Sequence, residues 1–229
     1  MNDRKIIFKE LKKLMNESTF NELKCRDCLK NVPDILVDLK IFDNISFETE
    51  TPSYCGNSDL LIKVDGKDDH EQPEKIAYLW EIKSPQLPIF QTETKHRIRP
   101  TNHLYEAENQ LINYYSNIIN DETFRDRLKT SRYNVKFGGI IIGRRDKLVS
   151  NKHNMQDVKG NYNIYKAIRS EYFYKHNNIK LYNWDDILDQ LSREIHEKKY
   201  IKSNISFNEK SLIDNLDISE HIEVSISNN

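Results

Sequence analysis

The fold of this chain is decided by residues 76–85, which read IAYLWEIKSP. Aromatic and branched residues dominate the first five positions, and this composition favours a β-strand. Ser84 and Pro85 then end the strand, because proline has no N–H to give to a sheet. Residues two apart on a strand point to the same face, so Glu81 and Lys83 are expected side by side, with Ile82 turned to the core.

A second strand is predicted over residues 57–64, with Asp59 near its beginning. The polar segment 65–74 carries Gly66 and Pro73 and indicates a long hairpin connection. If the two strands pair, Asp59 lies beside Glu81. Two carboxylates bind a hard divalent cation through oxygen, and a nearby lysine orients a water or offsets charge on a phosphate under attack. This pattern is typical of a nuclease metal site.

The acid-x-Lys pattern alone is unspecific, because it begins at nine positions of this highly charged chain. Only the copy at Glu81 follows a β-favouring apolar run and is cut off by a proline. The alternative at any single copy is an ordinary strand end with a solvated acid and lysine. The neighbouring strand with Asp59 favours the metal-site interpretation.

Length and charge restrict the remaining possibilities. A chain of 229 residues is long enough to bury a hydrophobic core. Its net charge of −1 provides no overall positive field to attract nucleic acid, so any contact with nucleic acid needs a local basic patch. No apolar run is long enough for a bilayer and no signal-peptide core is present, which predicts a cytoplasmic protein without membrane contact.

We expect an N-terminal helical segment over 1–42, a main domain over 43–200 and a polar tail over 201–229.

The remaining pattern predicts an α/β domain with a mixed central sheet flanked by helices. Residues 135–143 form a near-continuous apolar run, which suits a strand buried on both faces. Residues 101–119 have a helical apolar stripe that Gln110 borders. Further helices are expected over 4–15, 19–29, 122–131, 164–174 and 185–196, a short helical piece from Pro33, and further strands over 45–49 and 179–182.

Cys25 and Cys28 form a CxxC pair, and Cys55 is a distant third cysteine. A structural zinc site needs four ligands, and no second CxxC or His pair exists. We therefore expect buried or half-buried free thiols. A cysteine-based enzyme is disfavoured because no His is placed to activate these thiols.

Four ordered segments resemble the Shedu family of antiphage defence proteins, within the PD-(D/E)xK nuclease superfamily. They lie between about residues 19 and 195 and consist of a leading helix, a catalytic strand, a helix with an Ala-x-x-Gln-x-x-x-Tyr pattern, and a closing pair of strands with a helix. The corresponding stretches are residues 21–36, WEIKSP at 80–85, AENQLINY at 107–114, and FGGIIIGR at 137–144 with LYNWDDIL at 181–188. Ser58 before Asp59 departs from the proline of the superfamily name.

The resemblance implies a restriction-endonuclease-like core and a metal-dependent DNA endonuclease, expected as a homo-oligomer. Asp59, Glu81 and the backbone carbonyl of Ile82 would bind Mg²⁺ or Mn²⁺, and Lys83 would act on the water or phosphate. Gln110 would hold Lys83 or the water, although a solvated helix edge is its alternative. Glu22 would be a further acid at the site, and its alternative is a capping box with Thr19.

A basic connector follows the catalytic strand and is the candidate DNA contact: Lys95, His96, Arg97 and Arg99. Such side chains clamp a phosphate backbone without reading its sequence. A second basic group, Arg144, Arg145 and Lys147, is less favoured because it lies farther from the predicted site. Two other functions stay open, namely a catalytically silent nucleic-acid-binding module and an assembly or sensor subunit with the same fold.

Overall fold

The computed structural model describes residues 2–37, 45–48, 59–67 and 70–196. Its centre is a five-stranded mixed sheet in the order β1-β2-β3-β6-β8. The first three strands of that order pair antiparallel, and β3, β6 and β8 pair parallel. The prediction of an α/β protein with a mixed sheet is confirmed. The strands are β1 (Ile45–Glu48), β2 (Leu60–Lys67), β3 (Pro73–Ile82), β6 (Val135–Ile141) and β8 (Lys180–Tyr182).

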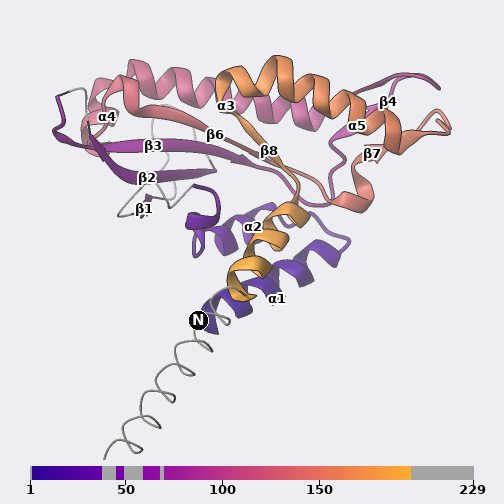
Figure 1. Ribbon diagram of the computed structural model, residues 1–229, viewed down its shortest axis with the longest axis horizontal. Helices are drawn as coiled ribbons and strands as arrows, with labels where there is room; N and C mark the ends of the chain where they lie inside the picture. Colours follow the sequence, from indigo (N-terminus) through magenta and orange to yellow (C-terminus); the bar gives the residue numbers. More distant parts are fainter. Residues whose placement is uncertain (1, 38–44, 49–58, 68–69, 197–229) are drawn as a thin grey trace, which may run out of the picture.

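Helices cover both faces of this sheet (Figure 1). One face carries α3 (Asn102–Asn120), α4 (Glu122–Leu128) and α5 (Val158–Arg169), which continues as a π-helical turn over Ser170–Tyr174. The other face carries α1 (Asn2–Asn16), α2 (Glu22–Leu29), a short 3-10 helix (Pro33–Ile35) and a helix whose described part spans 184–196. Because strand side chains alternate, each face has its own apolar cluster.

A bulge in the pairing of β3 with β6 accommodates a large side chain. The register shifts between Leu79 and Trp80, so that Trp80 lies opposite Gly139. A Cβ atom on Gly138 would lie 2.2 Å from Trp80 Nε1. The Gly138–Gly139 pair therefore leaves the space that the fully buried Trp80 ring occupies.

A second, three-stranded sheet lies beyond the exit of β3. It has the order β5-β4-β7 and consists of β4 (Phe90–Thr92), β5 (Ile98–Pro100) and β7 (Val149–Ser150). The sequence indicated only a polar connector here, because strands of two or three residues carry no measurable alternation. Short 3-10 turns occupy Arg132–Asn134, Arg145–Lys147 and Lys175–Asn177.

Most elements lie where the sequence pattern predicts them, but several boundaries differ. β2 continues to Lys67, beyond the predicted end at Val64, and α4 ends at Leu128 rather than at residue 131. β3 begins at Pro73, which was assigned to the loop, and α5 begins at Val158 rather than Ile164. Cys25 and Cys28 are free and buried, as expected, whereas Cys55 and the tail over 201–229 lie outside the described residues. No helix in the described ranges has the length and apolar character needed to cross a membrane.

Candidate active site

The pairing of β2 with β3 brings Asp59 to Glu81. Leu60 lies opposite Trp80 in an antiparallel register, so the preceding residue of one strand meets the following residue of the other. The backbone N–H of Ile82 donates to Asp59 Oδ2 at 2.9 Å, and this bond fixes the carboxylate. The spatial relation expected between these two acids is thus present.

Glu81 is almost completely buried, with 1% of its side chain exposed. Its Oε1 lies 2.7 Å from Lys83 Nζ, whereas no described group donates a hydrogen bond to its Oε2. Burial, together with repulsion from Asp59, raises the pKa of Glu81 to about 8, although Lys83 opposes this shift. A buried carboxylate with a free oxygen beside a second acid is a place that favours a bound cation.

Lys83 is fixed by its backbone as well as by its ion pair. Its N–H donates to the carbonyl of Ile141 at 2.8 Å, and its carbonyl accepts from Trp184 Nε1 at 2.8 Å. Burial lowers the pKa of Lys83, but the carboxylates of Glu81, Glu22 and Asp59 raise it, and the net shift is upward. The ammonium group is therefore held in its charged form next to the acids.

The leading helix α2 adds Glu22 and Arg26 to this group. The predicted capping box is wrong, because α2 begins at Glu22 after Asn21, whose side chain makes no cap hydrogen bond. Burial raises the pKa of Glu22, while Lys83 lowers it and Asp59 raises it, so this carboxylate faces the same site. Arg26 Nη1 lies 3.8 Å from Asp59 Oδ1.

Helix α3 contributes Gln110 and, one turn later, Tyr114. Gln110 Oε1 is buried without a hydrogen-bond partner in the described part of the chain. Burial, followed by the carboxylates of Glu81, Asp59 and Glu22, raises the pKa of Tyr114 to about 12. The apolar stripe of this helix left Tyr114 and Tyr115 as alternatives for the core, and the sequence assigned Tyr114 no role beside the acids. Its spacing of four from Gln110, on the same helix face, was the available signal.

The side chains at this site could supply some, but not all, of the oxygen ligands of a hard divalent cation. Among the described residues, no three His, Cys, Asp or Glu side chains gather as a metal-holding group. Asp59 and Glu81 provide two carboxylates, and Glu81 Oε2 is an acceptor to which no described residue donates. Mg²⁺ is commonly held by one or two carboxylates with waters in the remaining positions, so the residues present are compatible with it.

The predicted DNA-contacting residues lie apart from the acids. Lys95, His96, Arg97 and Arg99 are all exposed, on or beside the connection between β4 and β5. Arg97 forms a partial ion pair with Glu93, at 3.6 Å. In the described structure, no contact joins the four to the carboxylates, so they form a separate basic tip.

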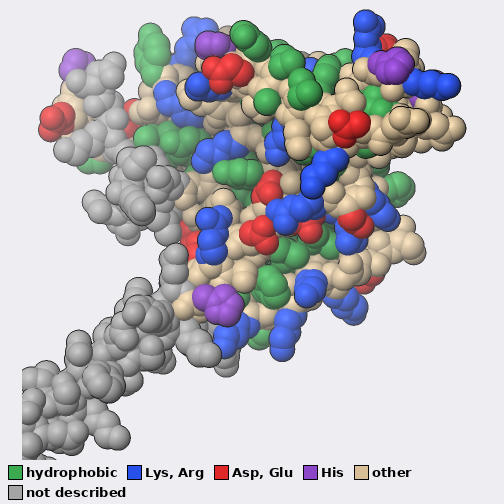
Figure 2. All heavy atoms as spheres, turned by 45° about the vertical axis from the view of Figure 1, so that its right-hand side comes forward, with side chains coloured by type: hydrophobic (Ala, Val, Ile, Leu, Met, Phe, Trp, Pro, Cys, Tyr) green, Lys and Arg blue, Asp and Glu red, His purple; other side chains and the backbone are tan. Residues whose placement is uncertain are grey.

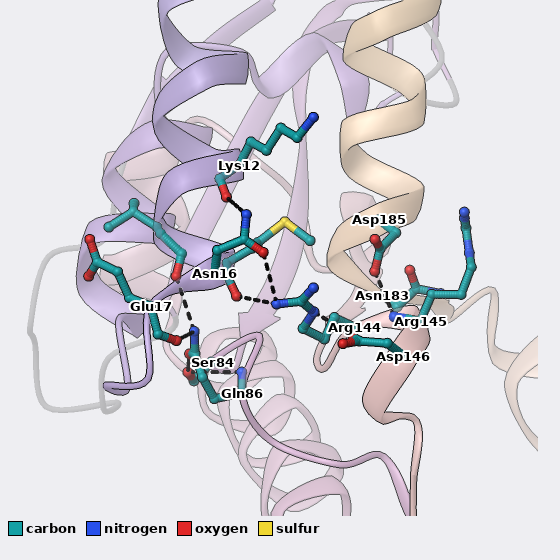
Figure 3. Close-up of polar contacts among 12 residues, drawn as sticks. Lys12, Asn16, Glu17, Ser84, Gln86, Arg144, Arg145, Asp146, Asn183 and Asp185 are labelled. Carbon is teal, nitrogen blue, oxygen red and sulfur yellow. Dashed lines mark hydrogen bonds and ion pairs between the residues drawn. The ribbon is translucent and has the colours of Figure 1, made fainter.

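The two arginines of the second basic group form contacts within the molecule (Figure 3). Arg144 Nη1 donates to the carbonyl of Met15 at 2.5 Å. Arg145 Nη2 lies 3.2 Å from Asp186 Oδ1 and 2.9 Å from Asp189 Oδ2. These arginines therefore join the exit of β6 to α1 and to the helix over 184–196.

Residues 19–188 match a family model described as Shedu protein SduA, C-terminal. The matched range contains Glu22, Asp59, Glu81, Lys83 and Gln110, and it leaves out α1. No curated protein and no solved structure matches the chain.

Proposed function

Because the chain belongs to the Shedu family of antiphage defence proteins, we propose that it is a metal-dependent DNA endonuclease with a restriction-endonuclease-like, PD-(D/E)xK core. One observation carries this proposal. Asp59 and Glu81 lie side by side, Lys83 lies 2.7 Å from one Glu81 oxygen, and the other Glu81 oxygen has no described partner. As the family resemblance implies, we also expect a homo-oligomer.

Asp59, Glu81 and the Ile82 carbonyl would hold Mg²⁺ or Mn²⁺. When bound, such an ion would supply Lewis-acid stabilisation to the phosphate. Lys83 would place its ammonium group against the attacking water or the phosphate oxygens, where charge builds up as the bond breaks. Its fixed backbone and its position next to Glu81 support this role.

Gln110 and Glu22 complete the proposed site. The buried Gln110 oxygen without a partner would accept a hydrogen bond from Lys83 or from the attacking water. Glu22 would orient that water or Lys83 from the side of α2. Lys95, His96, Arg97 and Arg99 would contact DNA phosphates at the exposed tip.

The test is cleavage of circular and linear DNA by the purified chain with Mg²⁺, Mn²⁺ or EDTA. We expect metal-dependent cleavage that falls by about 10²-fold or more in Glu81→Gln and in Lys83→Met, because each removes a charged group from the reaction centre. Glu106→Gln is the matched control, since this acid is on α3 with 64% of its side chain exposed. The far-ultraviolet circular dichroism of all variants should agree.

Cleavage that survives both substitutions would exclude this site as the catalytic one. Absence of cleavage by the wild-type chain with every metal and DNA form would contradict the nuclease proposal. That result would favour the catalytically silent alternative, a nucleic-acid-binding, assembly or sensor subunit with the same fold.

A further inference from the structure

Helix α1 presents a row of lysines opposite its buried face. At 100° per residue, Lys5, Lys9, Lys12 and Lys13 fall within about a quarter of the helix circumference. The opposite side packs into the core through Ile7, Leu11, Leu14 and Met15. All four lysines are exposed, and none forms an ion pair with a described residue. We call these four residues the lysine face.

The two acids of α1, Asp3 and Glu10, lie outside the arc of the lysine face. Glu10 lies on α1 between the lysines and the core, and it is close enough to the Cys28 thiol to hydrogen-bond with it. The lysine face therefore adds four positive charges at one place in a chain whose net charge is −1. Basic side chains are visible along the lower part of the surface in Figure 2, at the height of α1 in Figure 1.

The carboxyl end of α1 is bound to the loops that leave the two central strands (Figure 3). Gln86 Nε2 donates to the carbonyls of Leu14, at 3.1 Å, and of Glu17, at 3.0 Å. Gln86 follows Lys83 by three residues, and Ser84 Oγ donates to its amide oxygen. From the β6 side, Arg144 Nη1 donates to Met15 and also lies 3.3 Å from Asn16 Oδ1.

The amino end of α1 is fixed as well. Arg4 forms ion pairs with Asp34 and with Glu194 on the helix over 184–196. Both ends of α1 are thus attached to the body of the protein. The lysine face consequently has a fixed position relative to the exit of β3, where the proposed catalytic lysine lies.

We propose that the lysine face of α1 binds the phosphate backbone of duplex DNA and forms part of the substrate surface of this protein. This inference rests on the proposed function, whose site it extends to a helix outside the family-matched range. Lys5 and Lys13 are eight residues apart, which is about 12 Å along the helix axis. Duplex DNA carries about one charge per 1.7 Å of its axis, so several phosphates fall within this length.

A membrane surface fits the same helix less well. Amphipathic helices bind bilayers by burying their apolar face among lipids. The apolar face of α1 is already packed in the core, and Ile6 is the exposed large apolar residue described on this helix. Charge without available apolar surface favours a polyanion such as DNA.

The test is duplex binding, measured by fluorescence anisotropy in EDTA, with Lys83→Met as the non-cleaving background. One variant replaces Lys5, Lys9, Lys12 and Lys13 by Gln. The control replaces four exposed lysines elsewhere, Lys129, Lys136, Lys175 and Lys180, by Gln. Each variant loses four positive charges from the Lys83→Met background, so the net charge changes from −2 to −6 in both, and the two variants differ in where the charge is removed.

We expect the lysine-face variant to bind at least tenfold more weakly at low salt. Its plot of log affinity against log salt should be shallower by about 0.9 per lost phosphate contact, or about 3 to 4 in total. The control should bind within about twofold of the parent. Equal losses in both variants, or no loss in the first, would overturn the proposal.

Vesicle binding and DNA cleavage show whether a negative result concerns the DNA-binding face or the nuclease activity. If lysine-face substitutions left DNA binding intact but abolished binding to phosphatidylserine vesicles, the partner would be a membrane and the proposal would be wrong. Cleavage by the wild-type chain, with Lys83 intact, is scored independently with Mg²⁺. Lysine-dependent binding without any cleavage would sink the nuclease proposal and leave the DNA-binding face supported.

Discussion

Trp184 Nε1 donates a hydrogen bond to the backbone carbonyl of Lys83 at 2.8 Å. The backbone N–H of Trp184 also donates to Gly143, at the exit of β6, at 2.9 Å. Trp184 is fully buried and begins the helix over 184–196. One residue of the closing helix therefore joins the exits of both central strands and fixes the backbone at the proposed catalytic lysine.

Trp184→Phe should lower the free energy of unfolding by about 1 to 3 kcal/mol, because the buried Lys83 carbonyl would lose its donor. Cleavage measured well below the unfolding temperature should also fall, since Lys83 would be less firmly placed. Urea denaturation and plasmid cleavage check the two effects. Tyr133→Phe, at an exposed position, is the control, and equal activity in the two variants would contradict the link to Lys83.

Gln110→Met should reduce cleavage by about tenfold or more while leaving stability within about 1 kcal/mol of the parent. The buried amide oxygen has no hydrogen-bond partner among the residues that the structure describes, so an apolar side chain of similar shape removes an unsatisfied acceptor. Urea denaturation and cleavage kinetics with Mg²⁺ distinguish the two properties. A loss of several kcal/mol with unchanged cleavage would assign Gln110 a structural role.

Gly139→Ala should destabilise the protein by about 3 kcal/mol or more, because overpacking forces backbone shifts. The new Cβ atom would lie 2.1 Å from the backbone carbonyl oxygen of Lys180 on β8. Gly160→Ala is the matched control. There the atoms nearest to the new Cβ belong to the capping side chain of Asp157, and the loss of the cap is offset by the better helix propensity of alanine. Thermal unfolding of both variants is the measurement.

Glu108→Gln should cost about 2 to 3 kcal/mol of stability. Glu108 accepts from Arg169 Nη2 at 2.6 Å and from the hydroxyl of Tyr174, and it joins α3 to the end of α5. Without its charge, the mostly buried Arg169 is left uncompensated. Glu106→Gln on the same helix should change stability by less than about 0.5 kcal/mol, as an exposed site. Similar costs in both variants would exclude the buried network as the cause.

Cys25 and Cys28 should resist alkylation in the folded protein. Burial raises the pKa of both thiols to about 12, so almost no thiolate is present at pH 8.5. Because the unfolded thiols ionise near pH 9, their contribution to stability is complete below that pH and falls as pH rises toward 12. Iodoacetamide labelling, followed by mass spectrometry of the peptide that contains both residues, tests this. Rapid labelling without denaturant would contradict it.

The basic tip and the short second sheet mark a limit of prediction from sequence. The pattern predicted Lys95 to Arg99 as an exposed basic connector, which is where the structure places these residues. It did not predict β4, β5 and β7, because each has at most three residues. β4 and β5 form a short hairpin, and β7 joins them by pairing with β4 from far along the chain. Likewise, Glu22 and Tyr114 have ordinary local alternatives, and their place beside Asp59 and Glu81 depends on how α2 and α3 pack.

The sequence by itself determined the strand over 76–82, its end at Ser84–Pro85 and the shared face of Glu81 and Lys83, since alternation and proline act through the nearest neighbours. It also determined the helix over residues 4–15 and the α/β class. Only the tertiary structure decided that Asp59 lies beside Glu81, that Gly138 and Gly139 leave room for Trp80, and that Trp184 holds Lys83. These contacts join residues far apart in the chain, so they follow from the register and packing of the whole sheet rather than from any local pattern.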